Sequence, residues 1–148
     1  MVKVSVITAT FNSENTIQRN IDSVKRQKNI ILEQIFVNGG SSDNTVGIIE
    51  SLSPNASSLI VGQDSGVYDA QNVGLKQSSG EFIAILNSDD FFNDDQVLSD
   101  IITVFERDQV DIVYSGITYV NPKYEIIGEW APEELSLGSF SDSWASRC

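Results

Sequence analysis

Short apolar runs alternate along the chain with segments in which apolar residues recur every three or four positions. The runs predict buried strands at 2–10, 35–37, 59–61, 82–86 and 112–114. The segments between them predict four helices, at 17–24, 46–52, 68–78 and 97–105. This alternation predicts an α/β fold with a mainly parallel sheet and helices on both of its faces.

The boundaries of these elements follow from capping and breaking residues. Ser13 can cap the first helix, Pro54 ends the second, and Gly80 ends the third. The pattern changes after residue 118, where the stretch 119–135 predicts a hairpin and the serine-rich stretch 136–148 has no clear period. We therefore expect one domain over 1–118, followed by a hairpin and a loosely ordered tail.

Polar residues gather directly after three of the predicted strands. The clusters are Thr10-Phe11-Asn12, the NGGSSD stretch at 38–43 and the NSDD stretch at 87–90. In a parallel α/β sheet, ligands bind outside the carboxyl ends of the strands. We therefore expect the three clusters to line one crevice.

The third cluster ends a buried apolar run with two adjacent carboxylates, in the sequence FIAILNSDD. Hard cations such as Mg²⁺ or Mn²⁺ take carboxylate oxygens and leave coordination positions for phosphate. The alternative is a turn before a helix N-terminus, where Asp and Asn are also favoured. The agreement of three strand ends favours a metal site at 87–90, whereas Asp94 and Asp95 fit the start of the next helix.

The other two clusters also have structural alternatives. The glycines that begin at Gly39 permit a tight backbone path, and Ser42 or Asp43 can cap the next helix. Asn38 would still project from its strand toward the crevice. Phe11 can belong to the core, or it can offer an aromatic face on which a nucleobase stacks.

The chain is acidic, with 21 Asp and Glu against 9 Lys and Arg and a formal net charge of −12. Such a surface repels nucleic acid and anionic membranes, so neither is expected as a direct partner. The sequence contains no histidine, which excludes His-based catalysis and the usual zinc sites. Its single cysteine, Cys148, leaves no internal disulfide. A phosphate-bearing substrate would therefore depend on a metal or on backbone N–H groups.

The first apolar run is too short for a secretory signal and is followed by polar residues. No apolar run approaches the roughly 18 residues that a membrane span needs. A cytoplasmic domain without a transmembrane segment is therefore expected.

The motifs SVITATFN, VNGGSSDNT, DSGVYDAQNVG and GEFIAILNSDD, in this order, resemble the nucleotide-sugar-binding half of the family 2 glycosyltransferases. The resemblance covers residues 2–95 and extends more weakly to Trp130. It implies the GT-A fold, a Mn²⁺- or Mg²⁺-dependent site, and transfer of a sugar from a nucleoside diphosphate with inversion. It also implies polysaccharide biosynthesis on a saccharide or lipid-linked acceptor, but the motifs specify no sugar.

The resemblance also implies roles for residues at matching positions. Phe11 stacks on the base, Asn38 recognises the base, and Asp89 binds the metal. The other residues that it assigns to the nucleotide-sugar-binding site are Ala9, Thr10, Asn12, Asp64, Gly66, Asn72, Asn87 and Ser88. The catalytic base is left unassigned.

The sequence departs from the family pattern in three respects. Asn38 stands where Asp is usual, and Ser65 and Val73 stand where relatives often carry Lys or Arg. Relatives run to well over 200 residues, and their catalytic base lies beyond the matching region. The late carboxylates here are Glu133, Glu134 and Asp142, none of them in a recognisable motif. We therefore expect a donor-binding domain that is either a truncated form of a longer enzyme or an enzyme completed by another chain, and that alone binds a UDP-sugar but transfers it slowly.

Two functional hypotheses follow from these patterns. The first is a metal-dependent glycosyltransferase domain that reaches the inner face of the membrane through partner proteins. Its oligomeric state is left open. The second is a non-catalytic nucleotide-sugar-binding module that acts through a partner. A nucleotidyltransferase is disfavoured, because the chain lacks a Gly-rich phosphate loop with Lys.

Overall fold

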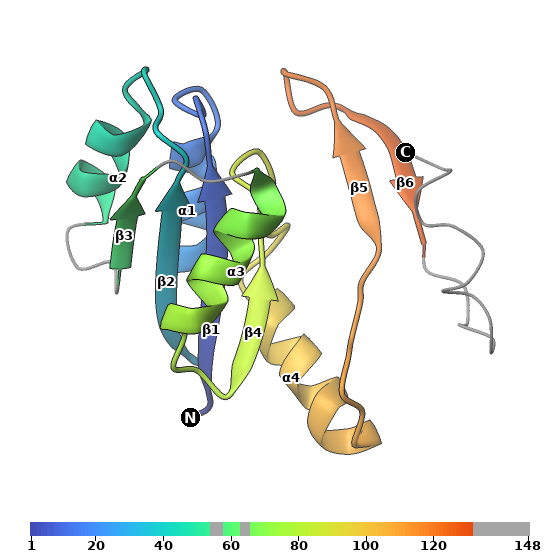
Figure 1. Ribbon diagram of the computed structural model, residues 1–148. Coiled ribbons are helices and arrows are strands. Elements are labelled where there is room, and N and C mark those ends of the chain that lie inside the picture. The colour runs from blue at the N-terminus through green and yellow to red at the C-terminus, as the bar shows by residue number, and fades with distance from the viewer. Residues whose placement is uncertain (54–57, 63–65, 132–148) are drawn as a thin grey trace.

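The computed structural model describes residues 1–53, 58–62 and 66–131. Strands and helices alternate from the N-terminus to α4, and a hairpin follows (Figure 1). The elements are β1 Lys3–Thr10, α1 Ile17–Lys25, β2 Ile31–Asn38, α2 Thr45–Leu52, β3 Ser58–Val61, α3 Val67–Gln77, β4 Phe82–Ile85, α4 Val97–Asp108, β5 Ile117–Val120 and β6 Ile126–Trp130.

The first four strands form one parallel sheet in the order β3-β2-β1-β4. The pairing brings Thr10 of β1 level with Asn38 of β2, and Ile7 of β1 level with Ile85 of β4. The polar residues that follow β1, β2 and β4 therefore meet at one edge of the sheet, at the top of Figure 1. This arrangement confirms the predicted α/β fold with a parallel sheet.

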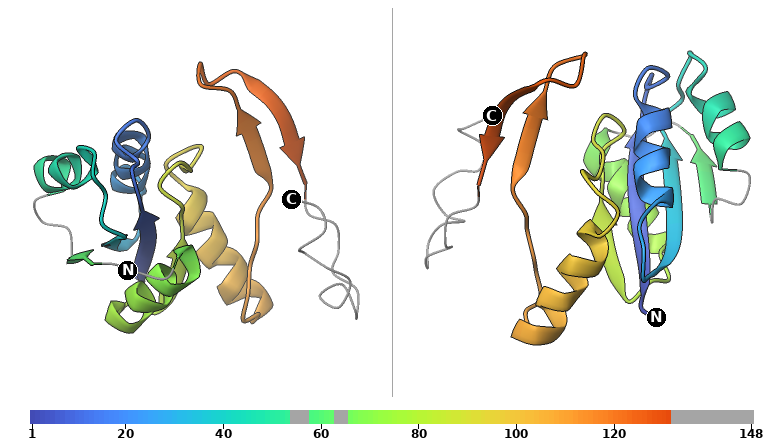
Figure 2. Two further views of the ribbon diagram at one scale, coloured as in Figure 1. Left: turned by 45° about the horizontal axis from the view of Figure 1, so that its top comes forward. Right: turned by 180° about the vertical axis from the view of Figure 1, so that it is seen from behind.

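Helices cover both faces of the sheet (Figure 2). On one face, Val4 and Val6 of β1 pack with α1 and α4, and Phe36 of β2 packs with α1 and α2. On the other face, α3 places Ala70 against Ile35 and Val37 of β2. These side chains are almost fully excluded from water, so their burial holds the layers together.

Helix α3 lies unusually close to β1 because a glycine faces the sheet. A Cβ atom at Gly74 would lie well under 3.0 Å from Cγ2 of Ile7, a fully buried side chain. The close contact is possible only without a side chain at residue 74. It sets the position of α3, whose first turn reaches the top edge of the sheet.

The α3 face of the sheet also buries one carboxylate, that of Glu33 in β2. It accepts hydrogen bonds from Nζ of Lys3 at 2.7 Å, from the backbone N–H of Ser79 at 2.7 Å, and from the hydroxyls of Ser79 and Ser5. Burial by itself would raise the pKa of Glu33, but these donors outweigh it and lower the pKa from 4.5 to about 2. The charged form of Glu33 therefore stabilises the fold.

The chain after α4 differs from the sequence prediction. The predicted strand at 112–114 is wrong, because these residues form an irregular connection, in which Ile112 is 73% exposed. A strand needs a second strand to pair with. In the next segment, β5 pairs antiparallel with β6, which is close in the sequence. The hairpin begins two residues before the predicted stretch, and the expected tail at 136–148 lies outside the described residues. The division of the chain into domains stays a prediction.

The hairpin contacts the rest of the molecule through its turn. The guanidinium of Arg19 in α1 lies 3.4 Å from the ring centroid of Tyr124 and 3.9 Å from that of Phe91. The two rings meet edge to face, with their centroids 6.2 Å apart. This cation–π contact joins the hairpin turn to α1 and to the segment that follows the NSDD stretch at 87–90.

Candidate functional site

A pocket of about 560 Å³ opens at the edge where β1, β2 and β4 end. Its size is that of a small-molecule site. The residues that line it are Ala9, Thr10, Phe11, Gly39, Gly66, Val67, Ala70, Asn87, Ser88 and Asp89. The structure thus brings together most of the residues that the sequence placed in a nucleotide-sugar site, although no bound ligand tests their roles.

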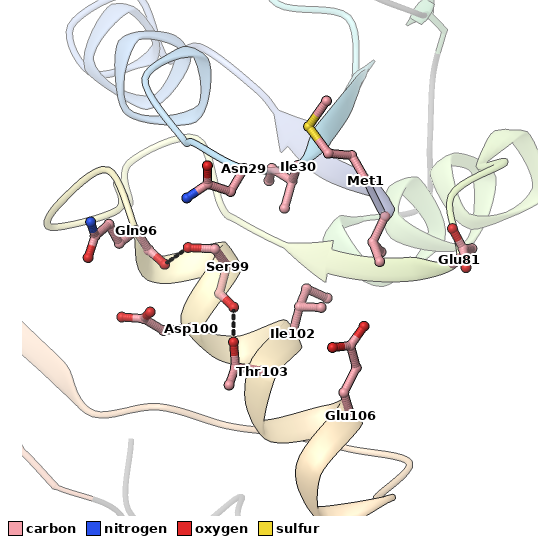
Figure 3. Close-up of a pocket in the computed structure, with 11 residues that line it drawn as sticks. Met1, Asn29, Ile30, Glu81, Gln96, Ser99, Asp100, Ile102, Thr103 and Glu106 are labelled. Atoms are coloured by element: carbon pink, nitrogen blue, oxygen red, sulfur yellow. Dashed lines mark hydrogen bonds between the residues drawn. The ribbon is translucent and has the colours of Figure 1, made fainter.

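A larger cavity of about 740 Å³ lies at the opposite end of the sheet, beside α4 (Figure 3). Its described lining contains none of the strand-end residues. Two of its hydroxyls are already used within α4, since Ser99 donates to the carbonyl of Gln96 and Thr103 donates to the carbonyl of Ser99. Three carboxylates, of Glu81, Asp100 and Glu106, also face this cavity, which therefore suits an anionic ligand poorly.

β4 is followed by a tight acidic turn from Asn87 to Asp90. The backbone N–H of Asp90 donates to the carbonyl of Asn87 at 3.0 Å, and the amide of Asn87 donates to the Asp90 carboxylate at 3.2 Å. Asp89 stands at the third position of the turn, exposed and in the wall of the pocket. Partial burial raises the pKa of Asp90, and the neighbouring charge of Asp89 raises it further.

The donor set of this turn fits a divalent cation that is shared with a ligand. The described residues contain no group of three or more His, Cys, Asp or Glu side chains that could enclose a metal. The carboxylate of Asp89 could hold one side of a Mg²⁺ or Mn²⁺ ion, leaving the remaining positions to phosphate and water. Such open coordination is typical of cations that bind together with a phosphorylated substrate.

Asn38, which the sequence assigned to base recognition, is fully buried at the end of β2. Its amide group donates to the hydroxyls of Thr10 at 3.0 Å and Ser41 at 2.8 Å. Its carbonyl oxygen accepts from the backbone N–H groups of Gly40 and Ser41 at 3.0 and 2.9 Å. All of these groups are engaged inside the protein, so a direct bond to a base would require one partner to be exchanged.

Asn12 does not line the described pocket but joins the loop after β1 to the loop after β2. Its backbone N–H donates to the hydroxyl of Ser41, and its side-chain oxygen accepts from the backbone N–H of Ser42. Nearby, Thr45 accepts from the backbone N–H of Ser13. The backbone N–H of Glu14 donates to the carboxylate of Asp43, and the carboxylate of Glu14 accepts from the backbone N–H of Asn44. The loops after β1 and β2 are therefore held to each other by hydrogen bonds.

The remaining predicted residues lie at the rim or away from it. Phe11 lies at the mouth with 63% of its surface exposed, so its ring is free to meet a flat ligand. Gly66 precedes α3 as its N-cap residue, with a φ of 119°, a backbone conformation that favours glycine. Asn72 is exposed on α3 and does not line the described pocket, and Asp64 lies outside the described residues.

Sequence reasoning gave the hydroxyl of Ser13 the wrong role. The first helix begins at Ile17 with no side-chain cap, and the Ser13 hydroxyl instead lies 2.8 Å from that of Ser88. This contact joins the loop after β1 to the acidic turn. The second helix does have a local cap, since the Asp43 carboxylate accepts from the backbone N–H and hydroxyl of Thr45.

A set of buried polar side chains on α1 and just after its C-terminus was missed entirely. Asn20, Ser23 and Gln27 each bond to the backbone of the segment that follows β4. They recur at spacings of three and four, beside the apolar stripe that contains Ile21 and Val24. A polar stripe of helical period that adjoins a buried one is the signal that could have revealed them.

Among the helices in the described ranges, none has the length and hydropathy needed to cross a bilayer.

Three comparisons with known proteins agree with this geometry. The family model described as "Glycosyl transferase family 2" matches residues 5–132. A UDP-Glc:alpha-D-GlcNAc-diphosphoundecaprenol beta-1,3-glucosyltransferase of Escherichia coli, WfgD, is 30% identical over 147 residues, which cover 98% of this chain and 57% of WfgD. A PGL/p-HBAD biosynthesis glycosyltransferase of Mycobacterium bovis is 30% identical over 117 residues, covering 76% of this chain and 46% of that protein.

Solved structures show the same fold. S. aureus TarS 1-349 in complex with UDP-GlcNAc superposes with a TM-score of 0.65 and 32% identity, over 74% of this chain and 32% of TarS 1-349. The mannosyltransferase PcManGT from Pyrobaculum calidifontis, in complex with GDP-Man and Mn²⁺, has a TM-score of 0.65 at 21% identity, over 81% of this chain and 36% of PcManGT. These neighbours are GT-A fold glycosyltransferases, so the chain has that fold. It spans only 38% to 57% of the length of the curated relatives that it matches.

Proposed function

The chain belongs to glycosyltransferase family 2, and we propose that its pocket binds a UDP-sugar as the donor for transfer to a saccharide or lipid-linked acceptor. The proposal includes a divalent cation, Mn²⁺ or Mg²⁺, and inversion at the anomeric carbon. The name of WfgD, with alpha-D-GlcNAc-diphosphoundecaprenol as the acceptor, supports this acceptor class. We further propose that the protein works at a membrane surface in polysaccharide biosynthesis, reached through its acceptor or a partner.

One observation supports the proposal above all others. An exposed aromatic ring, Phe11, and an exposed carboxylate, Asp89, line the same pocket, just beyond the ends of the adjacent parallel strands β1 and β4. A nucleoside diphosphate needs a surface for its flat base and a means of neutralising its phosphates, and these two groups could supply both.

Different lining residues would then contact different parts of the nucleotide. The ring of Phe11 would stack on the uracil, beside the backbone of Ala9 and Thr10. Asn87 and Ser88 would lie against the ribose and the phosphates. Asp89 would hold the cation, which when bound offsets the charge that develops on the leaving diphosphate.

Asn38 would act on the base through its neighbours. Its amide fixes the hydroxyls of Thr10 and Ser41, and Thr10 itself lines the pocket. The proposed preference for uracil therefore depends on how Asn38 orients these hydroxyls.

The lining residues of the described pocket include no Lys or Arg. The negative charges of the diphosphate would therefore be balanced mainly by the cation at Asp89, which makes nucleotide binding dependent on metal.

Titration calorimetry with UDP tests the proposal. We expect binding in Mn²⁺ and a loss of about tenfold to a hundredfold in affinity after chelation or in Asp89→Asn. Asp111→Asn is the matched control, because it makes the same change in charge at an exposed residue in the connection after α4. Equal affinity in all of these conditions would refute a metal-assisted donor site.

A second experiment separates the enzyme from the alternative, a non-catalytic binding module. UDP release from UDP-glucose and UDP-GlcNAc is followed with and without lipid-linked acceptors. Acceptor-dependent release that Asp89→Asn abolishes supports the transferase. Tight UDP-sugar binding without any release, even when partner proteins are present, supports the module.

A further inference from the structure

Helix α1 presents a buried amide directly beneath the acidic turn. Asn20 is 1% exposed, and its Nδ2 atom donates to the carbonyl oxygens of Asn87 at 2.9 Å and Asp90 at 3.1 Å. Its Oδ1 atom accepts from Nε2 of Gln34, a buried side chain of β2, at 3.3 Å. The side chain thus connects the sheet to the turn through three hydrogen bonds.

The two carbonyls that Asn20 binds belong to the first and last residues of the turn. Between them stands Asp89, the carboxylate proposed to hold the cation. The turn has only one backbone bond of its own, from the N–H of Asp90 to the carbonyl of Asn87. Two further bonds from a buried, anchored side chain fix both ends of the turn, and hence the backbone from which the Asp89 side chain projects.

The other polar residues on the same stripe act farther along the segment. Ser23 accepts from the backbone N–H of Phe92 at 3.1 Å. Gln27 donates to the carbonyl of Asp94 and accepts from the backbone N–H of Leu98. Within the described contacts of this stripe, therefore, Asn20 is the side chain that reaches the turn itself.

We propose that Asn20 is a positioning residue, which orients the Asn87–Asp90 turn and thereby sets the affinity of the site for a divalent cation with its nucleotide. The proposal rests on the function proposed above. Side chains that orient a metal ligand are typically worth about tenfold to a hundredfold in metal affinity. A merely structural residue would change the stability of the fold without changing the metal dependence of binding.

The test compares Asn20→Ala with Ser23→Ala. Both variants remove a buried polar side chain of α1 that bonds to the same segment, but only the first loosens the acidic turn. Calorimetry measures UDP affinity with Mn²⁺ and with chelator, and hydrogen exchange measures protection at 87–90, a range that leaves out the Phe92 N–H bonded to Ser23. Asn20→Ser, whose short side chain cannot reach both carbonyls, replaces Asn20→Ala if the latter does not fold.

We expect Asn20→Ala to weaken UDP binding in Mn²⁺ by about tenfold or more, to leave metal-free binding unchanged, and to speed exchange at 87–90, where Ser23→Ala should not. Ser23→Ala should stay within about twofold of the wild type in Mn²⁺. Unchanged exchange, or equal losses in the two variants, would overturn the role of Asn20. If the wild type itself binds no UDP in Mn²⁺, the proposed function fails, and with it the effect on affinity, while exchange still reports whether Asn20 holds the turn.

Discussion

Replacing Gly74 with alanine is expected to destabilise the protein and to weaken the pocket at the same time. The new Cβ atom would lie well under 3.0 Å from Cγ2 of Ile7, whereas carbon atoms in contact sit about 3.5–4.0 Å apart. Ile7 is fully buried in the middle strand of the sheet and cannot turn aside. Helix α3 must therefore shift outward by about 0.5 Å or more.

The magnitude follows from two opposing effects. Alanine favours a helix by about 1 kcal/mol relative to glycine. Forcing a methyl group into a packed core costs about 1–3 kcal/mol, and a contact this close belongs near the upper end. We expect a net loss of about 1–2 kcal/mol in the free energy of unfolding. Because α3 carries Val67 and Ala70 in the pocket wall, UDP affinity should fall as well.

Urea unfolding followed by circular dichroism measures the stability, and Gly47→Ala is the matched control. Gly47 is exposed in α2, where a new Cβ would come under 3.0 Å from Oδ1 of Asn44, the end of an exposed side chain that can rotate away, so alanine should stabilise by up to about 1 kcal/mol. In an Ile7→Ala background the clash is gone, and Gly74→Ala should then be neutral or stabilising. A Gly74→Ala protein as stable as the wild type, with unchanged UDP affinity, would refute the close packing described for α3.

Two other changes test separate parts of the structure. Because the pKa of Glu33 is lowered to about 2, its carboxylate contributes fully to the free energy of unfolding above about pH 4.5, and this contribution is lost as the pH falls toward 2. At about 1.4 kcal/mol per pKa unit, the contribution amounts to about 3 kcal/mol. Glu33→Gln should therefore lose up to that amount in urea unfolding at pH 7, and the difference from wild type should shrink below pH 4.5; a pH-independent difference would contradict the charge-based account. Asn38→Asp replaces the amide that donates to the hydroxyls of Thr10 and Ser41 with an acceptor, so these hydroxyls would donate inward and the Thr10 oxygen would be left to accept the N3–H of uracil, which cytosine lacks. UDP should therefore tighten relative to CDP in calorimetry, on the order of 1 kcal/mol; a wild-type preference for CDP would count against this view of the pocket.

The sequence was sufficient to predict the sheet and the position of the pocket. Apolar runs such as 82–86 mark buried strands, and parallel order forces the residues after them to one edge, so Phe11 and Asp89 could be brought together without a structure. The predicted strand at 112–114 failed because strand pairing depends on a partner, which a local apolar triplet does not reveal.

The details inside the site depend on contacts between distant parts of the chain. Asn20 bonds to residues 67 and 70 positions away, and no local pattern names those partners. Asn38 was expected to face a base, but nearby hydroxyls and N–H groups at Thr10 and Ser41 engage its amide first. In both cases a buried amide forms all the bonds that its surroundings offer, because leaving it unpaired would be costly.

The joined loops after β1 and β2 have a consequence for the thermodynamics of binding. Ordering a residue that is free in the unbound state costs about 1–2 kcal/mol of conformational entropy. Residues 10–14 and 38–45 are already held to one another by the bonds of Asn12 and Glu14 and by the bond between the N–H of Gly39 and the carbonyl of Thr10. If the pocket binds a nucleotide as proposed, the contacts with Thr10, Phe11 and Gly39 would be made to loops that are already ordered, and little interaction energy would be lost to ordering them.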